Sequence, residues 1–238
     1  MKQLLFILTL FSSTIGIGQN RQLHIKTYED GDTSLWYKWR IKLCTQIELE
    51  SVQNSKNNWH FRLWTNKQII DIWKDSNSVT SGKITSWTKE YTPNGEEPTN
   101  RIFYENKLLD SVKVNKLISL IDSTQIKNIP DEDSIVSWRQ GFDGITYIVE
   151  TVSTTDYFFK TYWTPTAQDS LKEAIVVQNF VDKCLIITES KELWSDFASR
   201  IPFECNINGG PMITIRALTK KERRKLKKDR ENYRQQKL

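Results

Sequence analysis

The sequence predicts an α+β fold in which an antiparallel β-meander sheet carries helices on one face and is followed by a basic helical tail. Three observations support this prediction. Short runs rich in β-branched and aromatic residues alternate with polar turns in the first half of the chain. Apolar residues at helical spacing appear in the second half. Lys and Arg then dominate the last stretch of the chain.

The first eighteen residues have the three parts of a secretory signal peptide. Lys2 supplies the positive charge, residues 4–11 form a short apolar core, and Gly16 and Gly18 are the small residues that precede a cleavage site. The apolar run is too short to cross a bilayer, which needs about 20 residues. We therefore expect cleavage after Gly18 and a secreted or periplasmic protein.

The strongest two-residue alternation runs from Leu35 to Leu49 and predicts an antiparallel strand with one buried and one solvated face. This length is unusual for a strand, so we expect a bend or bulge within it. Other strands are predicted at 59–64, 68–74, 79–91, 101–105, 145–151, 157–163 and 212–217, with 145–151 and 157–163 forming a hairpin.

Helices are predicted in three places before the tail. Apolar residues at i, i+3, i+4 and i+7 predict a helix over 114–121, with Asp110 or Ser111 as its N-cap. Pro165 opens a long second helix, because proline is tolerated in the first turn. A shorter helix is predicted near 191–199.

The positive charge of the chain is concentrated in its tail. Residues 220–238 hold ten basic and three acidic residues, a net charge of +7, whereas the whole chain carries +5. No repeat or linker divides the body, so we expect one domain over 19–217 and a helical or disordered tail over 218–238.

The tail cations are expected to attach the protein to an anionic envelope surface or to a protein partner, by an attraction that salt weakens. Nucleic acid is not an expected partner, because the signal peptide directs the chain out of the cytosol. The attachment residues are Lys220, Lys221, Arg223, Arg224, Lys225, Lys227 and Lys228.

Common catalytic signatures are missing from the sequence. His24 and His60 are the only histidines, and neither belongs to a metal-ligand, nucleophile-elbow or phosphate-loop motif, so no metal or cofactor is predicted. Two acids at the right separation suffice for glycoside hydrolysis, and Asp143 and Glu150 are the candidates. Asp143-Gly144 is first of all a turn signal, which favours a non-catalytic protein.

Three of the nine tryptophans, Trp36, Trp64 and Trp73, are predicted to face away from their aliphatic neighbours. On an exposed sheet face they would contact a ligand. A helix that covers this second face is the alternative, because tryptophan also favours strands for packing reasons.

The three cysteines leave two alternatives open. In an oxidising compartment, Cys184 and Cys205 are the closer pair for a disulfide, which leaves Cys44 as a free thiol. Otherwise all three are small buried residues, as free cysteines often are.

Two loose motifs lie in the second half of the chain. They are Trp-x-x-Gly-x-Asp-Gly-x-x-Tyr (Trp138, Gly141, Asp143, Gly144, Tyr147) and Pro-Phe…Gly-Gly (Pro202, Phe203, Gly209, Gly210). With the signal peptide and the meander before them, these motifs resemble secreted proteins of unknown function from Gram-negative bacteria. The resemblance implies a location and no chemistry.

The sequence therefore predicts an exported, non-catalytic binding or interaction protein of the bacterial envelope, whose ligand contacts the aromatic sheet surface. One alternative is a secreted glycan hydrolase that uses the carboxylate pair. A second alternative is a periplasmic lipid-binding protein with a curved sheet around the lipid.

Overall fold

The computed structural model describes residues 21–66, 68–92, 99–169, 171–208, 213–215 and 218–235. The predicted signal peptide over 1–18 and the Gly-Gly pair at 209–210 lie outside these residues.

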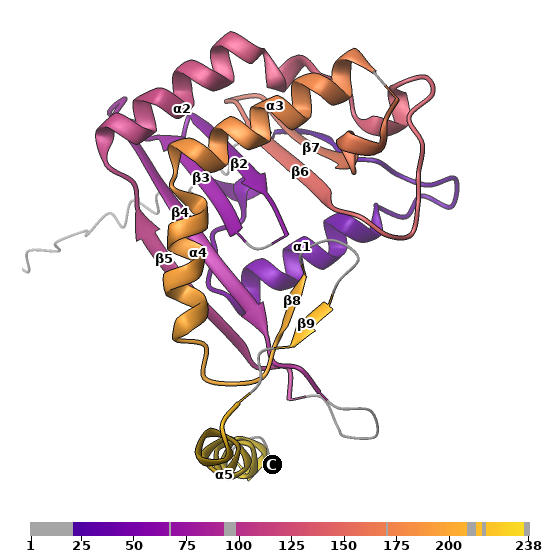
Figure 1. Ribbon diagram of the computed structural model, residues 1–238. Helices are drawn as coiled ribbons and strands as arrows, with labels where there is room; N and C mark the ends of the chain where they lie inside the picture. Colours follow the sequence, from indigo (N-terminus) through magenta and orange to yellow (C-terminus); the bar gives the residue numbers. More distant parts are fainter. Residues whose placement is uncertain are drawn as a thin grey trace, which may run out of the picture.

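A seven-stranded sheet forms the centre of the fold, in the order β1-β7-β6-β2-β3-β4-β5 (Figure 1). All neighbouring strands are antiparallel except β1, which runs parallel to β7. The α+β prediction is thus confirmed, as are the predicted strands at 59–64, 68–74, 79–91 and 101–105 and the β6–β7 hairpin. The strands are β1 (Gln22–His24), β2 (Trp59–Trp64), β3 (Gln68–Lys74), β4 (Thr80–Lys89), β5 (Ile102–Leu108), β6 (Thr146–Val152) and β7 (Asp156–Trp163).

Helices α2 (Ser111–Thr124) and α3 (Lys172–Ile187) lie side by side over one face of the sheet, here called the α2/α3 face. Asp110 is the N-cap of α2, because its carboxylate accepts a hydrogen bond from the Lys113 amide at 2.8 Å. The predicted start of α3 at Pro165 is wrong. That residue begins a short 3₁₀ turn, and α3 itself begins seven residues later.

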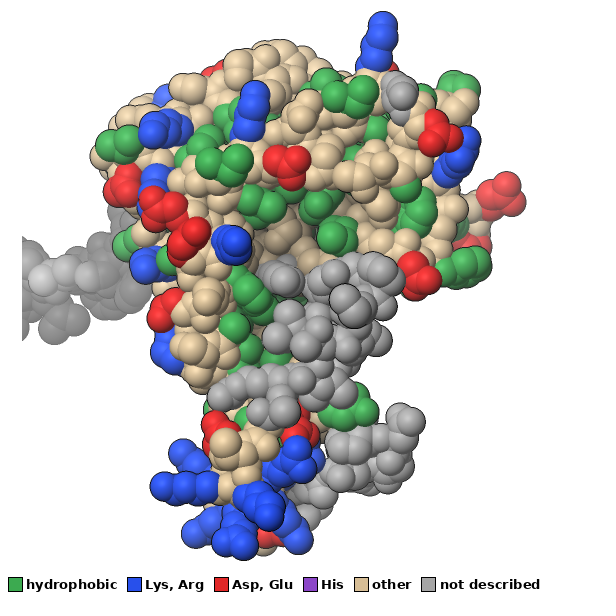
Figure 2. All heavy atoms as spheres, in the orientation of Figure 1, with side chains coloured by type: hydrophobic (Ala, Val, Ile, Leu, Met, Phe, Trp, Pro, Cys, Tyr) green, Lys and Arg blue, Asp and Glu red, His purple; other side chains and the backbone are tan. Residues whose placement is uncertain are grey.

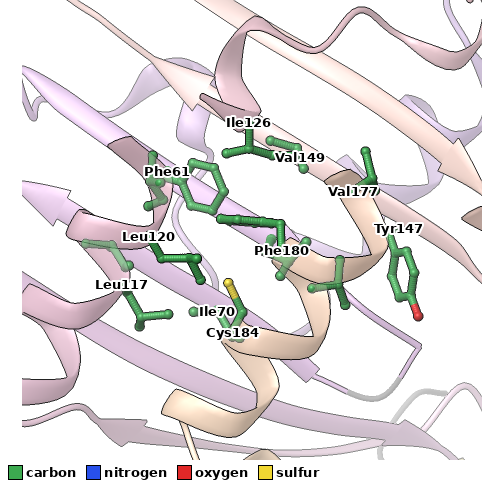
Figure 3. Close-up of a cluster of buried hydrophobic side chains, with 14 of the residues drawn as sticks. Phe61, Ile70, Leu117, Leu120, Ile126, Tyr147, Val149, Val177, Phe180 and Cys184 are labelled. Carbon is green, nitrogen blue, oxygen red and sulfur yellow. The ribbon is translucent and has the colours of Figure 1, made fainter. Parts of the chain in front are cut away.

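The main core fills the space between these two helices and the sheet (Figure 3). Alternate residues of β2 point into it, so Phe61 and Leu63 are buried against α2 and α3. Phe180 of α3 packs edge-on against Phe61, with ring centroids 5.7 Å apart. This burial of apolar surface is the main stabilising contribution to the fold.

Helix α1 (Leu35–Gln46) occupies the segment for which the alternation predicts a strand, so that prediction is wrong. Its buried residues are Arg40, Leu43 and Cys44, followed by Ile47 just after the helix, which is a helical spacing. Arg40 and Cys44 belong to the polar side of the alternating pattern. Because the helix buries an arginine and exposes Leu35, the apolar residues alone suggest the wrong period.

α1 packs on the opposite face of the sheet, the α1 face, so helices cover both faces and not one face as predicted. Trp64, Ile148 and Tyr157 from three adjacent strands lie in the cluster beneath it. The two core clusters fill both faces, which disfavours a curved sheet that encloses a lipid.

The last part of the chain adds α4, a small second sheet and α5 (Figure 1). α4 (Ser190–Ser199) follows α3 after Glu189, whose positive φ of 53° turns the chain sharply. β8 (Asn206–Asn208) and β9 (Ile213–Ile215) pair antiparallel, and α5 spans Lys220–Gln235. None of the helices in the described residues is long and apolar enough to cross a membrane.

The disulfide alternative is not realised in the structure. Cys184 carries a free, buried thiol in the main core, whereas Cys205 lies in a different cluster next to α5. Cys44 is also a free, buried thiol, beneath α1. The fold separates Cys184 from Cys205 because α4 carries the chain away from α3 before Cys205 is reached.

Candidate functional site

The basic tail forms a helix that is attached to the domain. Thr219 and Glu222 cap its N-terminus reciprocally: the Thr219 amide donates to Glu222 Oε2 at 2.8 Å, and the Glu222 amide donates to Thr219 Oγ1 at 3.3 Å. This Thr-x-x-Glu arrangement is a capping box, a signal that was available in the sequence. The cap begins α5 at a defined residue.

The inner side of α5 holds the helix on the domain. Leu226 is buried together with Phe197 and Phe203 in a small apolar cluster. Arg230 donates from Nε to Glu90 Oε1 at 2.8 Å and from an Nη to the Tyr91 carbonyl at 3.0 Å. The apolar contact and the charged hydrogen bonds lie one turn apart, so together they fix which side of the helix faces the domain.

The outer side of α5 is almost entirely cationic: blue side chains gather at the bottom of Figure 2, where Figure 1 places α5. Two of its three acids, Glu222 and Asp229, lie on the partly buried side of the helix, and only Glu231 is exposed. The outer side of the helix therefore carries most of its positive charge and little of its negative charge. All seven predicted attachment residues are exposed: Lys220, Lys221, Arg223, Arg224, Lys225, Lys227 and Lys228.

The predicted tryptophan surface does not exist as a continuous platform. Trp64 is fully buried beneath α1, so its assignment as a ligand contact is wrong and the covering helix of the alternative is present. Trp36 lies on α1 itself and is 43% exposed. Trp73 is half-buried on β3 beside His60, with ring centroids 6.1 Å apart. The error follows from the helix at 35–46, which covers the face that the alternation left open.

A buried polar network lies between α1 and the sheet. Arg62 Nε donates to Asp71 Oδ1 at 2.5 Å, and His60 Nε2 lies 3.0 Å from the same oxygen. Trp64 Nε1 and the Tyr157 hydroxyl donate to the two oxygens of Glu150 at 2.5 and 2.7 Å. Arg62 also approaches Glu150, at 3.9 Å, so one arginine links the two carboxylates.

Burial and charge act in opposite directions on this network. Burial alone would raise the pKa of Asp71, but Arg62 and His60 outweigh it and lower that pKa to about 2. Arg40 is buried, and its guanidinium carbon lies 4.3 Å from the ring centroid of Trp39 and 4.4 Å from that of Trp64. Burial lowers the pKa of Arg40 to about 9. The charged groups of this network are thus held inside the protein, between α1 and the sheet.

The two candidate catalytic carboxylates have unrelated environments. Glu150 is 4% exposed on the α1 face, and both of its oxygens are occupied by Trp64 and Tyr157. Asp143 is exposed in the loop before β6. Glu150 is four residues into that strand, about 13 Å beyond its first residue. The structure therefore does not bring the pair together, which removes the basis for the hydrolase alternative.

The loop that contains Asp143 is a packing feature. Gly144 has a φ of 145°, and a Cβ there would lie 1.9 Å from Thr164 Oγ1. A Cβ on Gly141 would lie 2.4 Å from the ring of Trp163. The glycines of the Trp-x-x-Gly-x-Asp-Gly-x-x-Tyr motif thus allow the loop to lie directly against the end of β7.

The histidines and the remaining acids form no metal site in the described residues. His24 stacks on Phe158 at 4.1 Å and its Nε2 lies 2.9 Å from Asp156, which ties β1 to β7. His60 belongs to the buried network. The sequence reasoning missed this network, although an arginine and an aspartate in the middle of apolar strands were a usable signal.

No protein-family model matches the chain, and no curated protein is significantly similar to it.

Proposed function

We propose that this chain is an exported, non-catalytic binding protein that attaches to an anionic surface of the bacterial envelope through α5. The observation that carries the proposal is the concentration of positive charge on the outer side of this helix, where seven cations and one acid are exposed among the side chains that the structure describes. An attachment helix must present its charge in one direction, and the contacts of Leu226 and Arg230 with the domain provide that orientation.

The magnitude of the attraction supports this assignment. Each Lys or Arg near an anionic lipid surface contributes about 1 kcal/mol. Three cations of one face therefore contribute about 3 kcal/mol, which is roughly a hundredfold in affinity. Insertion of the helix is not part of the proposal, because its one buried leucine faces the domain.

The test is cosedimentation with vesicles of phosphatidylglycerol and phosphatidylcholine. Lys221, Lys225 and Lys228 lie at i, i+4 and i+7 on the outer side, so the triple variant K221Q/K225Q/K228Q should bind phosphatidylglycerol vesicles about a hundredfold more weakly. Binding by the unmodified chain should also fall as salt shortens the screening length below about 10 Å.

The matched control changes the net charge by the same amount elsewhere. Lys116 on α2 and Lys172 and Lys183 on α3 are exposed, and K116Q/K172Q/K183Q should keep most of the binding. Equal losses in both triple variants would show that only the net charge matters. Equal binding to phosphatidylcholine alone would also contradict the proposal.

A further inference from the structure

A groove of about 680 Å³ lies where the end of α3 and the start of α4 face the sheet. Among the described residues, twelve line it, and they come from the β2–β3 turn, the start of β6, the end of α3 and the first turns of α4. Figure 1 shows this place as the sharp bend between α3 and α4. Neither α5 nor the buried network contributes to it, so it is a second, separate feature of the molecule.

The walls of the groove are mainly apolar. Ile145 and Tyr147 contribute from the sheet, Leu185 and Ile186 from α3, and Trp194 from α4. Ile186 is 75% exposed, although it is a large aliphatic residue at the end of a core helix. Exposed apolar surface inside a concavity is the usual composition of a small-molecule site.

The polar groups at the bottom of the groove already satisfy one another. Gln68 is buried, and its amide donates to Ser86 Oγ at 3.1 Å and to the Ser190 carbonyl at 3.2 Å. The Ser190 hydroxyl in turn donates to Gln68 Oε1. A ligand therefore does not need to supply hydrogen bonds to the bottom, which favours an apolar body.

The charges at the rim nearly cancel. Lys191 and Glu192 are adjacent on the first turn of α4, and neither forms an ion pair within the described part of the chain. Glu189, the other acid at the rim, is paired with Lys113 at 2.8 Å. One cation and one acid side by side do not select the sign of a charged head group.

The size of the groove favours a small molecule over a protein partner. Small-molecule sites have volumes of about 300–1,000 Å³, which includes this one. A stable protein interface uses about 20–30 residues on each side, more than the twelve described residues that line this groove. We propose that the groove binds the single apolar chain of an amphiphile, and that the chain rather than the head group determines affinity.

The test is isothermal titration with sodium octanoate and sodium decanoate below their critical micelle concentrations, and with 1-decanol below its solubility limit. Each added CH₂ should tighten binding about threefold to fourfold while the chain still fits the groove. Decanoate and 1-decanol should bind within about threefold of each other, because the rim carries both signs of charge. Binding that depends mainly on the head group would overturn the proposal.

A matched pair of variants locates the site. Ile186 and Ile175 are both exposed isoleucines of α3, at 75% and 50%, and only Ile186 lines the groove. I186E should bind decanoate at least tenfold more weakly, whereas I175E should bind it as the unmodified chain does. Unchanged circular dichroism shows that both variants are folded. An equal effect of the two substitutions, or no binding by the unmodified chain, would refute the site.

Discussion

The buried ion pair between Arg62 and Asp71 gives the sharpest prediction about the stability of the fold. Replacing Asp71 by Asn keeps the shape of the side chain and removes its charge. Arg62 then remains as a cation that is 1% exposed, with Glu150 as the nearest carboxylate at 3.9 Å. A buried charge that has lost its close partner is strongly destabilising, because it has no water around it and only a more distant counter-charge.

Two arguments from the structure give similar magnitudes for D71N. Removing one partner of a buried pair costs about 3–5 kcal/mol, and the lower end applies here because Glu150 compensates in part. The pKa of Asp71, held at about 2 by Arg62 and His60 against an ordinary 3.8, corresponds to about 2 kcal/mol of stability. We therefore expect D71N to lower the free energy of unfolding by about 2–3 kcal/mol at pH 7.

The pH dependence has a definite sign. The native protein keeps Asp71 ionised at lower pH than the unfolded chain does, so this contribution is complete above about pH 4. It is lost as the pH falls from about 4 to about 2. The difference in stability between the unmodified chain and D71N should therefore narrow over that interval, and other acids cancel in the comparison.

The assay is urea unfolding followed by tryptophan fluorescence at several pH values. Asp169 provides the control, since its carboxylate lies 2.5 Å from Arg139 but both side chains are about 70% exposed. Exposed pairs contribute about 0–1 kcal/mol, so D169N should have little effect. Two results would refute the reasoning. One is a decrease in the free energy of unfolding of less than 1 kcal/mol for D71N at pH 7. The other is a stability difference between the unmodified chain and D71N that does not change below pH 4.

Three further predictions concern other parts of the structure. L226A should lower the free energy that holds α5 on the domain by about 2–3 kcal/mol, because it removes a buried side chain from the apolar cluster with Phe197 and Phe203. Faster amide exchange in α5, with unchanged exchange in β2 and β6, checks this. W64F should cost about 1–3 kcal/mol in chemical unfolding, because it leaves Glu150 Oε2 without the indole donor at 2.5 Å, and a loss under 0.5 kcal/mol would contradict this role. Cys44 and Cys184 should resist iodoacetamide at pH 8 in the native protein and react in denaturant, as mass spectrometry can measure, because burial raises the pKa of Cys44 to about 12 and raises that of Cys184 as well.

Local patterns in the sequence were sufficient for most of the elements. The strands β2, β3 and β4, the β6–β7 hairpin, and helix α2 with its cap Asp110 follow from residue type, turn residues and helical spacing, which act over a few residues. The charge of the tail and the exposure of its cations were also predictable, because a helix rich in Lys and Arg keeps most of them in water. The signal peptide and the attachment to an anionic surface stay predictions.

The tertiary structure decided which of those elements pack together and which side chains they bury. Arg40 can be buried only because Trp39, Trp64 and Glu150 meet around it from α1 and two strands, so no local pattern could identify α1 as a helix that covers the sheet. The same packing buries Trp64 and Glu150 and separates Glu150 from Asp143. The groove between α3 and α4 also exists only after distant segments pack. Spacing along the chain determines secondary structure, whereas burial, and with it the availability of a side chain to a ligand, depends on which elements meet in space.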